Sequence, residues 1–158
     1  AKVEFSCALL IYKTRSHRDH PLPKFCAPYS FLSSQLIMPR MENDLLDVID
    51  AVIDGHVADL TLRWSDDATV AVVLASAGYP GVYLTGEPIV GTDALPEGTT
   101  VFHAATARRD GALVTSGGRV LAAMGRGPTH ASARTLAYEA ADAINFVGAQ
   151  RRADIAVF

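Results

Sequence analysis

The chain has 158 residues, of which 49% are hydrophobic and 20% charged, and its net charge is -3. These proportions are those of a soluble globular protein with one or at most two hydrophobic cores. The slight acidity gives no protein-wide attraction for nucleic acid, so we expect any anion to be bound locally, by placed arginines and backbone N–H groups. The sequence contains neither an apolar run long enough to cross a bilayer nor the pattern of a signal peptide, and we expect a cytoplasmic protein without membrane or nucleic-acid partners.

The first quarter of the chain shows no sustained helical or strand period. Residues 2–5 predict a short strand, whereas residues 8–34 contain three prolines, which fix φ and remove backbone donors, so no regular element is expected there. Cys7 and Cys26 are the only cysteines. Two thiols are too few for the disulfide framework of a small secreted protein, so we expect both to be reduced.

Residues 42–56 predict an amphipathic helix. Asn43 or Asp44 can cap its start, and Gly55 stands where a left-handed residue commonly ends a helix. Apolar side chains recur at helical spacing along one face, namely Leu45, Leu46, Val48, Ile49, Val52 and Ile53. Aspartates occupy the other face, for which we expect a solvated surface rather than a metal cluster.

After this helix the chain becomes rich in β-branched and apolar residues. The runs at 60–64 and 69–76 predict the two strands of a hairpin, with a polar turn at 65–67 between them. The second run is hydrophobic almost throughout. It therefore predicts a strand that is covered on both faces.

Two glycine-containing pairs, Asp110-Gly111 and Gly117-Gly118, predict two further hairpin turns. They separate three short predicted strands, VFHAAT at 101–106, ALVTS at 112–116 and RVLAAMG at 119–125. A last helix is predicted to begin near Thr129 and to end at Gly148, with a narrow face of small residues that can lie close against the sheet. The pattern as a whole predicts an α+β fold.

The corner Gly117-Gly118-Arg119 carries the strongest chemical signal in the chain. Glycine lets a ligand approach the backbone closely, and the guanidinium group offers a rigid fork of donors to phosphate or carboxylate. These residues therefore predict an anion site. The alternative is an ordinary hairpin turn that is followed by a solvated arginine.

No complete catalytic device is visible, since the chain lacks a nucleophile elbow, a Walker loop and a dinucleotide fingerprint. His103 suggests a general base, although a histidine inside a β run is more often packed and hydrogen-bonded. Arg152 and Asp154 predict an ion pair that fixes the end of the chain, and Arg40 is a candidate for supporting a joint between domains. A chain of this kind is expected to assist a site whose chemistry lies elsewhere.

Six segments follow one another in a characteristic order. They are ATVAVVLASAGYPGVY at 68–83, GEPIVG at 86–91, VFHAAT at 101–106, TSGGRVL at 115–121, ARTLAYEAADAINF at 133–146 and RRADI at 151–155. Together they resemble the C-terminal domain of the glycinamide ribonucleotide synthetase (phosphoribosylamine–glycine ligase) family, which belongs to the ATP-grasp superfamily. A further segment, QLIMPRMENDLLDVI at 35–49, resembles the end of the family's ATP-grasp domain and its linking helix.

The resemblance implies how the chain is divided. Residues 1–41 would be a remnant of the ATP-grasp domain with an atypical insertion at 8–34, residues 42–56 the linker helix, and residues 57–158 the C-terminal domain. It also implies the architecture of that last domain, which is a short antiparallel β-rich unit packed with one C-terminal helix. Most of the ATP-grasp domain would be missing from this chain.

The resemblance implies a ligase of purine biosynthesis. In the family, ATP activates glycine as an acyl phosphate, and the amine of 5-phosphoribosylamine attacks it to give glycinamide ribonucleotide, ADP and phosphate. Magnesium or manganese bridges the nucleotide phosphates. Glycine, 5-phosphoribosylamine and ATP would be the partners of a full-length, monomeric enzyme, while the isolated chain is expected to be inactive and to bind neither ATP nor the metal.

The family's metal ligands lie in a motif of the form EFNxRFGDPExQ, which is broken here. Residues 2–5 resemble its first strand, so that Glu4 corresponds to the metal-binding glutamate, but Ser6 stands at the asparagine position and the resemblance resumes only at Gln35. Glu4 is thus a candidate magnesium ligand, with a solvated or salt-bridged carboxylate as the alternative.

The resemblance also implies which anion the glycine corner would bind. Arg119 and the N–H groups of Gly117 and Gly118 would face the phosphate of 5-phosphoribosylamine or the acyl phosphate. Two other functions stay open. One is a noncatalytic binding or structural module that keeps the fold without the site, and the other is a related ATP-grasp ligase or carboxylase, which the closeness of ASAGYPG, VFHAAT and SGGRVL disfavours.

Overall fold

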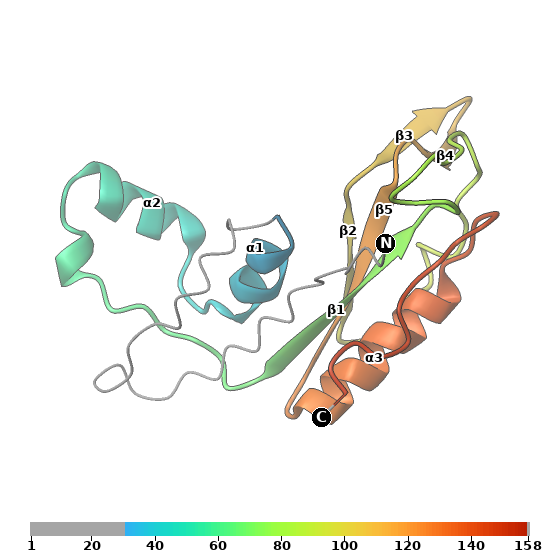
Figure 1. Cartoon of the computed structure of the whole chain (residues 1–158). Helices are drawn as coiled ribbons and strands as arrows, with labels where there is room; N and C mark the ends of the chain where they lie inside the picture. The colour runs from blue at the N-terminus through green and yellow to red at the C-terminus, as the bar shows by residue number, and fades with distance from the viewer. Residues whose placement is uncertain (1–30, 158) are drawn as a thin grey trace.

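The computed structural model describes residues 31–157 of the chain (Figure 1). An antiparallel sheet of three strands lies at its centre in the order β1-β5-β2, formed by Ala68–Ala75, Arg119–Gly127 and Thr99–His103. A separate hairpin pairs β3 (Thr106–Arg109) with β4 (Ala112–Thr115). The helices are α1 (Phe31–Ile37), α2 (Leu45–Ile53) and α3 (His130–Ala143), with short 3₁₀ turns η1 (Met38–Arg40) and η2 (Val57–Asp59). The predicted α+β fold is confirmed.

Helix α3 lies along one face of the sheet, and α1 lies on the other side (Figure 1). The face of α3 toward the sheet consists of four fully buried alanines, Ala133, Ala137, Ala140 and Ala141. They pack with Val70, Val72 and Leu74 of β1 and with Val120, Leu121 and Ala123 of β5. Small side chains allow the helix to come so close that a Cβ atom added at Gly125 would overlap the backbone of Ala133 and Ala137. The predicted small-residue face of this helix is therefore confirmed.

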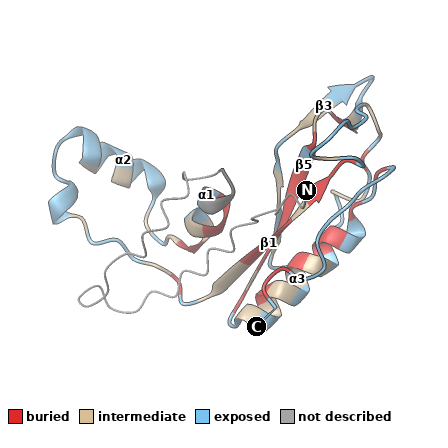
Figure 2. Ribbon diagram, viewed as in Figure 1, coloured by how far each residue is buried: buried red, intermediate tan, exposed pale blue. Residues whose placement is uncertain are grey.

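Strand β1 is covered on both faces, as its continuous hydrophobicity predicts. Its even-numbered residues from Val70 to Leu74 face the α3 core, while Ala71 packs on the other face with Leu36 of α1 and Met124 of β5. The buried residues follow the sheet and the inner side of α3 (Figure 2). Among residues 31–157, no helix is long and apolar enough to span a membrane.

The hairpin predicted between residues 60–64 and β1 is wrong. Residues 60–64 form no strand, and Trp64 makes only a single antiparallel bridge, with Met41. The backbone of this segment bonds instead to the residues around η1, since Ser65 N–H donates to the Arg40 carbonyl at 2.8 Å. The edge of β1 is paired with β5 instead, a partner about fifty residues further along the chain.

One of the two predicted glycine turns forms a hairpin and the other does not. Asp110 and Gly111 have φ values of 50° and 83° and join β3 to β4, as residues at the centre of a tight hairpin turn do. Gly117 and Gly118 connect β4 to β5, but β4 pairs with β3, and β5 pairs with β1 and β2. The hairpin predicted at Gly117-Gly118 is therefore wrong, and the pair forms a passage between two sheets.

The ends of the predicted helices show two further differences. Helix α3 begins at the Thr129 cap but ends at Ala143 rather than at Gly148, because Ile144 turns extended and is buried in the core together with Phe146. The last residues of the segment at 8–34, where no regular element was expected, belong to α1, whose first residue is Phe31.

Helix α2 has the predicted ends. The Asp44 carboxylate accepts a hydrogen bond from Leu46 N–H at 2.8 Å, and Gly55 has a φ of 74°. The other cap candidate, Asn43, instead bonds to the backbone of Thr61 and Arg63. The apolar stripe of α2 is left exposed, and no residue of the helix is buried (Figure 2).

Candidate functional site

The glycine corner is the passage from β4 to β5. Neither glycine has a positive φ, so their conformational freedom is not what the backbone requires here. Glycine is required at both positions because neighbouring side chains leave no room for a Cβ atom. A Cβ atom at Gly118 would overlap the Tyr79 ring and lie 3.0 Å from Cε1 of Tyr83, and a Cβ atom at Gly117 would lie 2.7 Å from the Cβ of Ala105. The side-chain position of Gly118 is thus taken by an aromatic ring of the protein itself.

Ser76 anchors the corner to the end of β1. Its hydroxyl donates to the Gly117 carbonyl at 2.9 Å, and its backbone N–H donates to the Gly118 carbonyl at 2.8 Å. Ser76 is buried, with 4% of its surface exposed, so both bonds are shielded from competing water. Together they fix the corner against the strand.

The two glycine carbonyls accept hydrogen bonds from Ser76, whereas the two glycine N–H groups have no such partner in the described part of the chain. No hydrogen bond between residues 31–157 uses the N–H of Gly117 or of Gly118. Gly118 is buried, and buried backbone donors are nearly always paired in native proteins. Two backbone donors that directly precede Arg119 in the chain therefore lack a protein partner among residues 31–157.

Arg119 is the first residue of β5 and lies next to a β-bulge. Leu74 of β1 pairs with Leu121, but the next residue, Ala75, pairs with Arg119, so that Arg119 and Val120 together oppose a single residue. The bulge lets the consecutive residues Val120 and Leu121 both enter the core, at 0% exposure, and leaves Arg119 at the surface. Within the described part of the chain, the Arg119 guanidinium makes no hydrogen bond or ion pair.

Gln150 also reaches this region, which the sequence did not indicate. Its backbone exchanges two hydrogen bonds with Ala75, of 2.8 and 2.9 Å, and its side-chain amide donates to the carbonyls of Ser76 and Tyr79 at 2.8 and 3.1 Å. Gln150 lies 74 residues from Ser76 along the chain. No local pattern could have found this contact.

The other predicted residues within 31–157 make hydrogen bonds elsewhere in the described part of the chain. His103, at the end of β2, is hydrogen-bonded as expected, through Nδ1 to the Thr106 hydroxyl at 3.1 Å, but it is exposed rather than packed. Arg152 and Asp154 form the predicted ion pair, at 2.6 Å, and the Arg152 hydrogen bond lowers the pKa of Asp154. Glu4 lies outside the described residues.

Arg40 is buried and joins η1 to the segment that leads into β1, since its guanidinium donates to the Ser65 carbonyl at 2.9 Å. Arg126 reinforces this joint by bonding to the Pro39 carbonyl at 2.8 Å and to the Asp67 carboxylate at 2.7 Å. The Arg126 hydrogen bond holds the pKa of Asp67 below its usual value, with a smaller contribution from the Ser65 hydroxyl. Among residues 31–157, no three His, Cys, Asp or Glu side chains form a group that could hold a metal ion.

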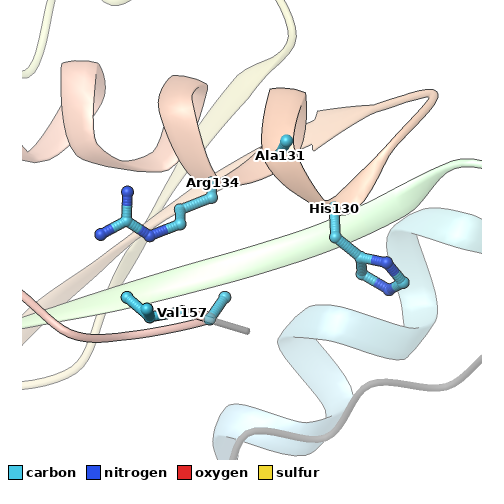
Figure 3. A pocket seen from close by; sticks show the side chains of 5 residues that line it. His130, Ala131, Arg134 and Val157 are labelled. Carbon is cyan, nitrogen blue, oxygen red and sulfur yellow. The ribbon is translucent and has the colours of Figure 1, made fainter.

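An open hollow of about 550 Å³ lies at the start of α3 (Figure 3). Its lining residues are His130, Ala131, Arg134, Ala156 and Val157. The Arg134 guanidinium is already engaged there, because it donates to the carbonyls of Ile155 and Ala153 at 2.8 and 2.9 Å and stacks on the Tyr138 ring. The hollow follows the end of β5, whereas the corner precedes its beginning. It is therefore separate from the anion-binding candidate.

The structure defines a small α+β domain, in which helix α3 packs on a three-stranded antiparallel sheet and a separate two-stranded hairpin leads into the glycine corner and Arg119. The family model described as phosphoribosylglycinamide synthetase, C domain, matches residues 69–157, which is more than half of the chain. The chain belongs to this family. The predicted family is thus confirmed.

Named relatives agree with this assignment. The phosphoribosylamine–glycine ligase of Caldanaerobacter subterraneus subsp. tengcongensis is 39% identical over 133 residues, which cover 84% of this chain and 32% of that protein. The ligase of Neisseria meningitidis serogroup A is 44% identical over 124 residues, covering 78% and 29%. The crystal structure of the phosphoribosylamine–glycine ligase of Thermotoga maritima superposes with a TM-score of 0.57 at 41% identity, over 68% of this chain and 27% of that one. The chain therefore spans less than a third of the length of these relatives.

Proposed function

We propose that this chain acts as the C-terminal domain of a phosphoribosylamine–glycine ligase, an ATP-dependent carbon–nitrogen ligase of purine biosynthesis. The observation that carries the proposal is the family match over residues 69–157, a region that contains the glycine corner with its surface arginine. Glycine, 5-phosphoribosylamine and ATP would be the substrates of the complete enzyme.

The reaction needs anion recognition at two points. The glycine carboxylate attacks the terminal phosphate of ATP and releases ADP, and the amine of 5-phosphoribosylamine then attacks the acyl carbon, so that the carbon–nitrogen bond forms and inorganic phosphate leaves. Both the acyl phosphate and the 5-phosphate of the second substrate carry negative charge. Donors that are already in place stabilise such charge without reorganising during the reaction.

Arg119 and the N–H groups of Gly117 and Gly118 supply donors of this kind. The arginine has no partner within residues 31–157, and the two glycine N–H groups have none there either. A guanidinium fork together with adjacent N–H groups matches the oxygens of a phosphate. We assign to these three residues the binding of the 5-phosphoribosylamine phosphate or of the acyl phosphate.

We assign the remaining chemistry to the parts of the ligases that lie outside the segment matched by this chain. We expect ATP and Mg²⁺ or Mn²⁺ to be bound there, and no step assigned to residues 31–157 uses a metal. The isolated chain is accordingly expected to be inactive. We further propose a monomeric, cytoplasmic enzyme that binds neither nucleic acid nor membrane.

The division into an ATP-grasp remnant at 1–41, a linker helix at 42–56 and a C-terminal domain at 57–158 is part of the same proposal. Helix α2 supports it, because Leu46 and Ile53 expose 67% and 74% of their surfaces. A helix that exposes its apolar face in this way fits a position against further protein.

The proposal is tested by replacing the matching C-terminal third of the Thermotoga maritima ligase with residues 35–158 of this chain and measuring ATP-dependent formation of glycinamide ribonucleotide. The same ligase without its C-terminal third is the control. We expect the hybrid to form product and both the truncated ligase and the 158-residue chain alone to form none. A hybrid that folds, binds ATP and still forms no product would favour a noncatalytic module that keeps only the fold.

A further inference from the structure

Gln150 and Arg119 are the two neighbours of Ala75 in the sheet. On one side, Ala75 N–H donates to the Gln150 carbonyl at 2.8 Å and the Ala75 carbonyl accepts from Gln150 N–H at 2.9 Å. On the other side, Ala75 pairs with Arg119 across the β-bulge. The segment after α3 is thus joined to the strand end from which Arg119 is presented.

The Gln150 side chain is placed by this pairing and uses both of its donors. Its amide nitrogen donates to the Ser76 carbonyl at 2.8 Å and to the Tyr79 carbonyl at 3.1 Å. A primary amide has two N–H groups, so both are satisfied. A carboxylate of the same shape could make neither bond, because it carries no donor when it is ionised.

Ser76 and Tyr79 are the two residues that hold the glycine corner. Ser76 donates to the carbonyls of both glycines, and the Tyr79 ring fills the side-chain position of Gly118. The turn at 76–79 is therefore fixed by Gln150 on one side and fixes the corner on the other. The segment that carries Gln150 is itself anchored, because Phe146 is buried and Gly148 lies close to Ala77.

We propose that Gln150 is a positioning residue for the phosphate-binding corner, which acts through Ser76 and Tyr79 on Gly117, Gly118 and Arg119. The proposal rests on the function proposed above. Gln150 itself touches no phosphate. Donors that lose their fixed position lose much of their binding advantage, so removal of the Gln150 amide should weaken phosphate binding about tenfold although every phosphate-binding residue is still present.

The test uses the 158-residue chain and ribose 5-phosphate as the probe, with inorganic phosphate as a second probe. Amide and guanidinium N–H signals of Gly117, Gly118 and Arg119 are followed by NMR during the titration, for the parent chain and three variants. Arg119→Met removes the charged donor. Gln150→Met removes the two amide donors without adding charge, and Gln150→Glu removes them and adds a negative charge.

We expect the parent chain to bind, Arg119→Met to lose binding, and both Gln150 variants to bind about tenfold more weakly while the signals of α3 and β1 stay in place. The unbound Gln150 variants should also show broadened or shifted signals at Gly117 and Gly118, which a loss of overall stability alone would not produce.

The remaining outcomes distinguish the positioning role of Gln150 from phosphate binding by the glycine corner. Parent-like dissociation constants in both Gln150 variants, together with loss of binding in Arg119→Met, would overturn the positioning role and leave the phosphate-binding corner standing. Unchanged binding in Arg119→Met, or no binding by the parent chain, would overturn the corner itself. If neither Gln150 variant folds, Gln150 is a stability residue and the positioning role is overturned.

Discussion

The Tyr79 ring occupies the space that a side chain at Gly118 would need, with the ring's Cε2 atom 2.7 Å from the position of a Cβ atom there. The second glycine of the corner is therefore required by an aromatic residue 39 positions earlier, since its φ is not in the left-handed region. This contact connects the turn after β1 to the residue that precedes Arg119.

Gly118→Ala should destabilise the chain by about 1–3 kcal/mol, because the added methyl group overlaps the Tyr79 ring. Urea unfolding followed by fluorescence or circular dichroism gives the free energy of unfolding. Combining Gly118→Ala with Tyr79→Ala should cost less than the sum of the two single changes, since the clash is then absent. Strict additivity in this double-mutant cycle would contradict the contact.

Gly125→Ala should be the more damaging substitution, costing about 3 kcal/mol or more, because the new methyl group meets the backbone of Ala133 and Ala137 rather than a movable side chain. Gly111→Ala is the matched control. A Cβ atom at Gly111 meets nothing within 4 Å, and only its positive φ of 83° opposes the change, for which about 1 kcal/mol is expected. Equal losses at the two positions would show that α3 does not approach β5 so closely.

The Asp67–Arg126 pair should make stability depend on pH in the acid range. Because the pKa of Asp67 is lower in the folded chain than the ordinary aspartate value of 3.8, the stabilisation is present above that value and disappears as the pH falls through the folded pKa. Both side chains are more than a third exposed, so the contribution should be at most about 1 kcal/mol.

Comparison of the parent chain with Asp67→Asn checks this at several pH values. The two unfolding free energies should differ at pH 7 and converge at the acid end of the titration. A difference that persists unchanged where Asp67 is protonated in both states would assign the effect to packing instead.

Ile53→Ser should change the stability of the isolated chain by less than about 0.5 kcal/mol, because the residue is largely exposed there. In the hybrid with the Thermotoga maritima ligase, the same change should cost more than about 1 kcal/mol if α2 packs against the rest of the enzyme. Thermal unfolding of both proteins makes the comparison. Equal small effects in the two settings would contradict the proposed place of α2.

The sequence predicted the elements that local patterns determine. The continuous hydrophobicity of β1, the small-residue face of α3 and the Asp110-Gly111 turn each depend on residues close together in the chain, and each is present in the structure. The choice of strand partners depends on distant residues. For that reason the hairpin predicted at 60–64 and the one predicted at Gly117-Gly118 were both wrong.

In the candidate site, too, the sequence indicated the residue with a local pattern and missed those that depend on distant contacts. Arg119 stood out in the sequence because it follows two glycines, and the structure leaves it at the surface beside two N–H groups without partners among the described residues. Tyr79 and Gln150 carried no such signal. Their contribution depends on contacts that join positions 39 and 74 residues apart, which no local spacing encodes.

The most direct test of the central claim is the kinetics of Arg119→Met in the active hybrid ligase, with Arg108→Met, an exposed arginine of β3, as the matched control. Loss of hydrogen bonds between a charged donor and phosphate should lower kcat/KM for 5-phosphoribosylamine by about 10- to 100-fold. A raised KM at constant kcat would indicate binding of the substrate's 5-phosphate, and a lowered kcat would indicate contact with the acyl phosphate. If kcat and KM in Arg119→Met both equal those of the parent hybrid and of Arg108→Met, the glycine corner is not part of the ligase site.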